Sequence, residues 1–177
     1  EIHWRDWSSD VCSSDLSNFT LLENNLIYNP RGLYLDQSPY HPRTVNIFER
    51  NNILYNSSGI QFQVSRERSI FKDNIIKGNI EPVVSDTPRN NLSINDWNGN
   101  YWDMYEGFDR NKDGYGDIPY KHYVYADKLW LYNPNVKFFY GSVVMDLLNF
   151  LAKFIPFSEP ELLAVDNNPK MEAKIAK

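Results

Sequence analysis

Three similar segments follow one another in the first half of the chain and constrain its fold more than any other feature. They are NLIYNPRGLYL from Asn25, NILYNSSGIQF from Asn52 and NIIKGNIEPVV from Asn74, and their starts are 27 and 22 residues apart. Each has an asparagine, two apolar residues, a polar corner and a short apolar strand. Repeats of this length without helical periodicity are typical of a β-solenoid, so we predict an all-β, right-handed parallel β-helix.

In such a coil, the apolar pairs after the three asparagines should stack between successive turns. These pairs are Leu26 with Ile27, Ile53 with Leu54, and Ile75 with Ile76. We expect Asn25, Asn52 and Asn74 to occupy equivalent corners, because asparagine side chains bond to nearby backbone and tolerate left-handed dihedral angles. The longer corner at 37–43 should project as a loop.

The first sixteen residues, EIHWRDWSSDVCSSDL, differ from the rest of the chain. Their string resembles a translated sequencing-library adapter, and we predict that origin for residues 1–16. A serine-rich leader is the alternative, although the segment has neither a basic start nor an apolar centre. Cys12 is the single cysteine of the chain. The segment holds four acidic residues and one arginine, so without it the net charge of −5 becomes −2.

The composition favours a water-soluble chain of ordinary domain size. The chain has 177 residues, 42% of them hydrophobic, and a mean hydropathy of −0.56. Its most apolar stretch, 143–157, is interrupted by Asp146, Asn149 and Lys153, which argues against a membrane span. There is no basic stripe for nucleic acid and no phosphate-loop, serine-hydrolase or zinc-protease motif.

The remaining chain divides into three predicted parts. Residues 17–95 form the last coils of the β-helix, residues 96–127 an aromatic and Asp-rich capping loop, and residues 128–177 a C-terminal extension. In the extension, apolar residues at helical spacing predict one short α-helix after Ser142, with Val144, Leu147, Leu148 and Leu151 on one face. We expect this face to cover the coil, with partner docking as the alternative, and the tail from Asn167 to fray.

The capping loop carries regularly spaced oxygen ligands. Asp109, Asn111 and Asp113 alternate before Gly114, and Asp117 follows. This is the first half of a calcium loop, although the twelfth position holds Tyr120 instead of an acidic residue, so an EF-hand is excluded. We predict a structural calcium site with Asp109, Asn111, Asp113 and Asp117 as ligands. The alternative is an Asx-rich turn held by hydrogen bonds without a metal.

Other chemistry is less clearly indicated. Copper ligands outside the first segment would come from His41, His122, Met104, Met145 and Met171, which show no paired spacing. Nothing selects a catalytic pair among the scattered carboxylates Glu67, Asp73 and Asp86. Trp97, Tyr101 and Trp102 would suit a sugar-stacking platform, although burial is the more common fate of such a cluster.

Several motifs together resemble the NosD family of β-helical maturation factors of nitrous oxide reductase. They are the segments 100–102 (NYW), 107–120 (GFDRNKDGYGDIPY), 133–142 and 156–160. The resemblance runs from Ser17 to the tail and marks the chain as a C-terminal fragment. Where relatives often read NYWSDY, this chain has Met104 between Asp103 and Tyr105.

The resemblance implies a periplasmic, non-enzymatic accessory protein for assembly of the copper-sulfur centre of that reductase. It implies copper or sulfur as cargo, without placing any copper ligand in this chain. The implied partners are an ABC transporter permease and ATPase, and nitrous oxide reductase or its copper chaperone, with the protein peripheral to the membrane. The competing hypothesis is a carbohydrate-active β-helix enzyme or a sugar-binding module.

Overall fold

The structure is a computed structural model that describes residues 18–36, 44–64, 68–85, 92–124, 142–144, 147, 151 and 161–173. The chain divides into two compact units. One comprises Glu1–Lys121 with Leu163–Lys177, and the other comprises His122–Leu162. In the described residues no helix is both long enough and apolar enough to cross a membrane.

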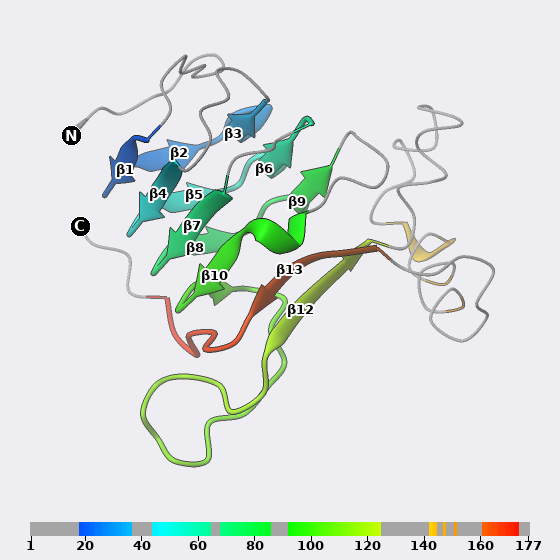
Figure 1. Cartoon of the computed structure of the whole chain (residues 1–177). Coiled ribbons are helices and arrows are strands. Elements are labelled where there is room, and N and C mark those ends of the chain that lie inside the picture. The colour runs from blue at the N-terminus through cyan, green and yellow to red at the C-terminus, as the bar shows by residue number, and fades with distance from the viewer. Residues whose placement is uncertain are drawn as a thin grey trace. The chain divides into compact units, whose positions relative to one another are not determined.

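Short strands stack into three sheets (Figure 1). The first sheet has the order β1 (Thr20–Leu22), β4 (Val45–Glu49), β7 (Arg68–Lys72), β10 (Asp96–Asn98), β13 (Glu161–Asp166) and β12 (Tyr120–Val124). The second has the order β11 (Tyr101–Trp102), β8 (Ile75–Lys77), β5 (Asn52–Leu54) and β2 (Asn25–Ile27). The third consists of β3 (Arg31–Leu35), β6 (Ser58–Phe62) and β9 (Glu81–Ser85), and a 3-10 turn, Leu92–Ile94, precedes β10.

We call one turn of the coil a rung. Each of the first three rungs gives one strand to each sheet, the next rung gives β10 and β11 to the first two sheets, and neighbouring rungs pair in parallel. For example, β1 pairs with β4, β2 with β5, and β3 with β6, all in parallel register. Consecutive strands of a rung therefore lie in different sheets, which is the arrangement of a parallel β-helix. The predicted fold class is confirmed.

The predicted register of the third repeat is wrong by one residue. Asn25 pairs with Asn52, but Asn52 pairs with Ile75 rather than with Asn74. Successive rungs are therefore offset by 27 and 23 residues, and Leu26, Ile53 and Ile76 form one apolar column. The equivalent of Asn74 is the first asparagine of each Asn-Asn pair, since Asn24, Asn51 and Asn74 all lie just before the strand.

The left-handed corners also differ from the prediction. The residue before each of these asparagines, and not the asparagine itself, has a positive φ: Glu23 at 57°, Arg50 at 54° and Asp73 at 57°. The next rung has a glycine there, Gly99, at 71°. Each corner therefore turns one residue before the asparagine and directs its amide inward. The predicted loop at 37–43 lies outside the described residues.

Stacked rings fill the interior of the coil. Phe48 stacks on Phe71 with a centroid distance of 4.8 Å, and Phe71 stacks on Trp97 at 4.0 Å. Ile60 and Val83 form a second buried column from the third sheet. In a parallel β-helix the side chains of successive rungs lie directly above one another, so flat aromatic rings at equivalent positions stack in close contact.

The predicted α-helix is only partly described. Val143, Val144, Leu147 and Leu151 are helical. Val144, Leu147 and Leu151 are 64%, 54% and 40% exposed within the structure. That this face covers the coil stays a prediction. Leu148 lies outside the described residues.

Gly59 lies where the coil allows no side chain. A Cβ atom at Gly59 would come within 2.6 Å of the Pro82 carbonyl oxygen and 3.1 Å of the Asn79 side chain. We expect Gly59→Ala to lower the free energy of unfolding by about 1–3 kcal/mol, the usual range for overpacking in a core. Urea unfolding measures the change. Because Gly59 does not have a positive φ, backbone strain does not add to this cost. A Gly59→Ala protein as stable as the unsubstituted chain would contradict the close contact.

Candidate functional site

A ladder of buried asparagines runs along one corner of the coil. In each pair of neighbouring rungs, Oδ1 of the asparagine that comes later in the chain accepts two N–H groups from the asparagine of the rung before it. For example, Asn74 Oδ1 accepts the backbone N–H of Asn51 at 2.9 Å and its amide Nδ2–H at 3.0 Å. The same two bonds join Asn24 to Asn51 and Asn74 to Asn100. Because these residues are buried, each bond replaces one that water would otherwise make.

Asp166 ends this ladder. It is fully buried, and its Oδ2 accepts the backbone N–H and the amide Nδ2–H of Asn100, both at 2.9 Å. Oδ2 also accepts the indole N–H of Trp102 at 3.2 Å. Oδ1 accepts the backbone N–H groups of Gly99 and Asn168, both at 3.1 Å. A carboxylate only accepts hydrogen bonds, which suits a position where five N–H groups converge.

The segment after Asp166 completes a final rung. Asp166 pairs in parallel with Trp97 of β10, and Lys170 forms a parallel bridge with Tyr101 of β11. The backbone N–H of Lys170 also donates to the Asn100 carbonyl at 2.9 Å. The prediction that the tail frays from Asn167 is therefore wrong for residues 168–171, because their backbone bonds to Asp166, to Asn100 and to the Asp-rich loop. Residues 174–177 lie outside the described part.

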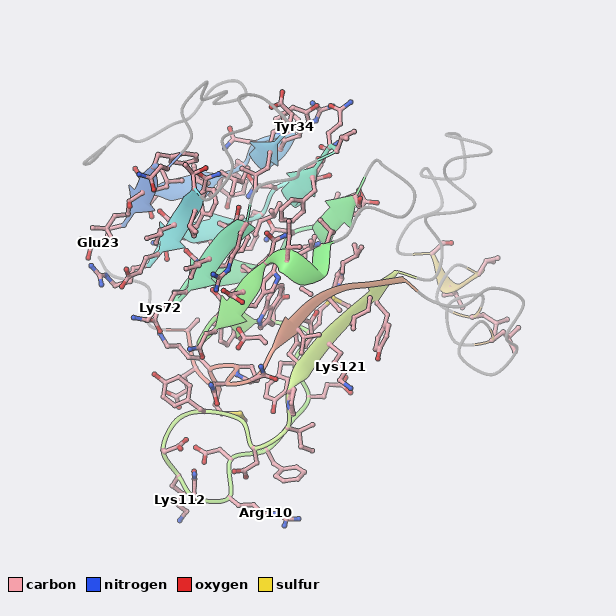
Figure 2. The ribbon with its side chains drawn as sticks, viewed as in Figure 1. Glu23, Tyr34, Lys72, Arg110, Lys112 and Lys121 are labelled. Atoms are coloured by element: carbon pink, nitrogen blue, oxygen red, sulfur yellow. The ribbon has the colours of Figure 1, made fainter. Side chains whose placement is uncertain are left out.

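This final rung holds the Asp-rich loop. Gly116 donates its backbone N–H to the Pro169 carbonyl at 2.8 Å, and Met171 donates to the Gly114 carbonyl at 3.0 Å. Within the loop, Asp117 donates its backbone N–H to the Phe108 carbonyl at 2.9 Å and closes the base. The far end, with Arg110 and Lys112, projects away from the strands (Figure 2). Backbone bonds from the second half of the loop, at Gly114 and Gly116, thus attach it to the final rung.

Three of the four predicted calcium ligands lie together in the projecting turn. Asp109 Oδ1 accepts the backbone N–H of Lys112 at 2.6 Å, and its Oδ2 accepts that of Gly114 at 2.8 Å. Asn111 and Asp113 bond to each other through their side chains at 2.9 Å. Asp117 lies at the base, where its Oδ2 accepts the backbone N–H of Arg110 at 2.7 Å. Asx-type hydrogen bonds therefore close this turn with protein groups alone.

The calcium site stays a prediction. Over the described ranges, no three His, Cys, Asp or Glu side chains converge in a metal-binding arrangement. The carboxylates of Asp109 and Asp113 keep lone pairs beyond those that accept the backbone N–H groups, so these hydrogen bonds and a bound cation are compatible. Titration calorimetry with calcium on the unsubstituted chain should then show binding that Asp109→Ala and Asp113→Ala remove, whereas Asp96→Ala, on strand β10, keeps it. Equal binding by all four proteins would exclude the loop as the site.

A pocket of about 300 Å³ lies between the loop and the final rung. Acidic residues from both sides line it, namely Asp73, Asp109, Asp113 and Glu172, together with Ile75, Gly114, Tyr115, Lys170 and Met171. Lys170 Nζ bonds to Asp73 Oδ1 at 2.6 Å. Of the three scattered carboxylates, Asp73 thus forms an ion pair at a corner, while Glu67 and Asp86 lie outside the described residues.

The structure describes three of the five candidate copper ligands. Met104 is exposed, Met171 lines the pocket, and His122 lies on β12. His41 and Met145 lie outside the described residues. Copper sites in proteins draw on His, Met or Cys, and in the described part of the chain no group of three His, Cys, Asp or Glu side chains could hold a metal ion.

The aromatic cluster is internal and not a sugar-binding platform. Trp97 and Trp102 are both buried, and Trp102 stacks on Tyr120 with a centroid distance of 4.6 Å. Burial, reinforced by the charge of Asp103, raises the pKa of the Tyr120 phenol above its usual value. Tyr120 therefore stays neutral at physiological pH and serves as a packing group. The sugar-stacking platform predicted for Trp97, Tyr101 and Trp102 is therefore wrong for the two tryptophans, while Tyr101 is half-buried.

Sequence comparisons agree with the fold. The family model of the periplasmic copper-binding protein NosD matches residues 2–107. Two curated relatives are each named "Probable ABC transporter binding protein NosD": the protein of Stutzerimonas stutzeri is 34% identical over 112 residues, and that of Pseudomonas aeruginosa is 32% identical over 112 residues. Both alignments cover 63% of this chain and 26% of the relative.

The matched region includes the rungs that begin with β1, β4, β7 and β10, and it ends before the Asp-rich turn. It begins within the first sixteen residues, whose adapter origin stays a prediction that resequencing of the source locus tests. The chain spans about a quarter of the length of the curated relatives that it matches. Because the family model covers more than half of the chain, the chain belongs to the NosD family of periplasmic copper-binding proteins.

Proposed function

We propose that this chain is part of an accessory protein for assembly of the copper-sulfur centre of nitrous oxide reductase. The observation that carries the proposal is the family match, which spans the asparagine ladder from Asn24 to Asn100. The names of the two relatives support an ABC transporter as a partner. In this proposal the contacts are to its permease and its ATPase. The reductase, or a copper chaperone that serves it, would be the second partner, with the protein peripheral to the membrane.

The role that we propose for the described part is that of a rigid, non-enzymatic scaffold. Buried asparagines and Asp166 bond to one another along the ladder, and Phe48, Phe71 and Trp97 stack between rungs. In our proposal this part of the protein holds no resident copper centre, which is supported by the lack of any group of three His, Cys, Asp or Glu side chains in the described residues that could hold a metal ion. Copper or sulfur would therefore be cargo of the assembly, handled through partners or through parts of the protein other than those described.

Deletion of the gene in a denitrifying host tests this function. We expect nitrous oxide reductase purified from the deletion strain to lack copper and sulfide in its copper-sulfur centre, with its polypeptide still present. The intact gene restores the centre, and an empty vector is the control. A deletion strain with a normal centre would contradict the proposal. A normal centre together with lost polysaccharide cleavage would favour the carbohydrate-active alternative.

A further inference from the structure

The corner after β10 carries the only Asn-Gly sequence of the chain, Asn98-Gly99. Asn98 is exposed, whereas Gly99 is buried and has a left-handed backbone with a φ of 71°. A Cβ atom at Gly99 would come within 2.8 Å of Asp73 Oδ1, so glycine fits this corner best. The fold therefore places an Asn-Gly pair directly before the ladder residue Asn100.

Asparagine followed by glycine is prone to deamidation, because glycine has no side chain that hinders its backbone nitrogen. In this reaction the Gly99 nitrogen loses its proton to hydroxide and bonds to Cγ of Asn98. The Cγ–Nδ2 bond then breaks, and Nδ2 takes a proton from water and leaves as ammonia, so the hydroxide is regenerated. Water opens the resulting cyclic imide at either carbonyl and leaves aspartate or isoaspartate, with no change in oxidation state.

In the folded coil, the final rung restrains the Gly99 nitrogen. Its N–H donates to Asp166 Oδ1 at 3.1 Å in a buried bond. A carboxylate beside this N–H opposes the loss of its proton, because two negative charges would then lie together in the interior. The Asn98 carbonyl also accepts the backbone N–H of Asp73 at 3.1 Å, which fixes the peptide bond in the strand. The nitrogen is therefore neither charged nor free to turn toward Cγ of Asn98.

The side chain of Asn98 is held by the same rung. Its Oδ1 accepts the amide Nδ2–H of Asn168 at 3.0 Å. A bond of this kind polarises the carbonyl and by itself would favour attack on Cγ, so the protection comes from the restraint on the Gly99 nitrogen. Asp166 and Asn168 both belong to the final rung. Detachment of this rung therefore frees the nitrogen and the Asn98 side chain in one step.

We propose that Asn98 is a site of spontaneous deamidation that the final rung protects, and that the isoaspartate product prevents this rung from docking again. Isoaspartate moves a methylene group from the side chain into the main chain, directly before Gly99. The backbone N–H groups of Gly99 and Asn100 then no longer align with the two oxygens of Asp166. A transient opening of the final rung is thereby converted into a permanent one.

The test follows the loss of Asn98 in the full chain at mildly alkaline pH, both under native conditions and in urea. Trypsin releases residues 90–110 as one peptide, in which mass spectrometry resolves asparagine, aspartate and isoaspartate at position 98. We expect the loss to be at least about tenfold slower in the folded chain than in urea, and Asp166→Ala to raise the rate in the folded chain at least about tenfold. Asn98→Gln is the matched control, because its longer side chain forms the cyclic imide far more slowly.

Two results with these proteins would overturn the proposal. One is loss of Asn98 that is as fast in the folded chain as in urea. The other is an equal rate in the unsubstituted chain and in an Asp166→Ala protein that keeps the circular dichroism of the coil. If Asp166→Ala does not fold, a urea series on the unsubstituted chain replaces it. The rate should then rise at urea concentrations below the global transition, together with hydrogen exchange at Gly99. A rise only together with exchange at Asn74 would overturn the role of the final rung.

The isoaspartate product is tested separately. Chains with isoaspartate at position 98 are purified after the reaction, and exchange is measured at the Trp102 indole N–H, which donates to Asp166 at 3.2 Å. We expect exchange at least about tenfold faster than in the unmodified chain. Exchange as slow as in the unmodified chain would overturn the claim that the modification keeps the final rung detached. None of these outcomes depends on the proposed role in reductase assembly.

Discussion

Replacing Asp166 by alanine is expected to lower the free energy of unfolding by about 3–5 kcal/mol. The carboxylate accepts five N–H bonds, from Gly99, from Asn168, from the Trp102 indole and two from Asn100. Alanine leaves these donors buried without an acceptor. It also frees the final rung, so the Asp-rich loop loses its attachment to Pro169 and Met171.

Urea unfolding followed by circular dichroism measures this loss. Asp166→Asn is the matched variant, because it keeps the shape but puts an NH₂ group where one of the two accepting oxygens was. We expect its stability to lie between those of Asp166→Ala and the unsubstituted chain. If both variants unfold within about 0.5 kcal/mol of the unsubstituted chain, as surface substitutions do, Asp166 does not end the ladder.

The reverse substitution within the ladder, Asn74→Asp, should also lower the free energy of unfolding strongly. Asn74 is fully buried, and its Nδ2 donates to the Phe48 carbonyl and to Asn100 Oδ1, both at 2.9 Å. In an aspartate, a negatively charged oxygen would replace Nδ2. It would face the Phe48 carbonyl and Asn100 Oδ1, which are themselves acceptors, with no cation beside it. We expect a loss of about 3–5 kcal/mol, the range for a buried charge without a partner.

Asn25→Asp is the control for this substitution. It makes the same chemical change on a half-buried side chain whose Oδ1 accepts the Asn52 amide at 2.7 Å, a role that aspartate retains. Its stability should stay within about 0.5 kcal/mol of the unsubstituted chain. Similar losses for Asn74→Asp and Asn25→Asp in urea unfolding would show that burial in the ladder does not distinguish the two asparagines.

The sequence predicted the coil because its apolar pairs recur at intervals that strands, and not helices, produce. It misplaced the third repeat because Asn24-Asn25 and Asn51-Asn52 offer two asparagines each, whereas the third repeat offers Asn74 alone. Asn74 can be aligned with the first or with the second asparagine of each pair, and the sequence alone does not distinguish the two alignments. Only the burial of one asparagine and the left-handed residue before it decide the register, and both depend on contacts between rungs.

The last rung could not be placed from local patterns. Asp166 lies 66 residues after Asn100, whereas earlier ladder residues are 23–27 apart, so no period connects them. The weak signal was the alternation in ELLAVD at 161–166, which is a short strand ending in a polar residue, like the segment before Asn51. For the Asp-rich loop, the spacing of Asp109, Asn111 and Asp113 correctly indicated a tight turn. It did not show that the carboxylate of Asp109 accepts hydrogen bonds from backbone N–H groups of the same turn.

Native-state hydrogen exchange at Gly99, Asn100 and the Trp102 indole tests most directly whether residues 163–173 complete the β-helix. All three groups donate to Asp166, and none has another acceptor if the final rung is detached. We predict exchange as slow as that of the backbone N–H of Asn74 in the middle of the ladder, and exchange at least a hundredfold faster in Asp166→Ala. Fast exchange at these groups in the unsubstituted chain, with Asn74 still protected, would contradict a coil closed by Asp166.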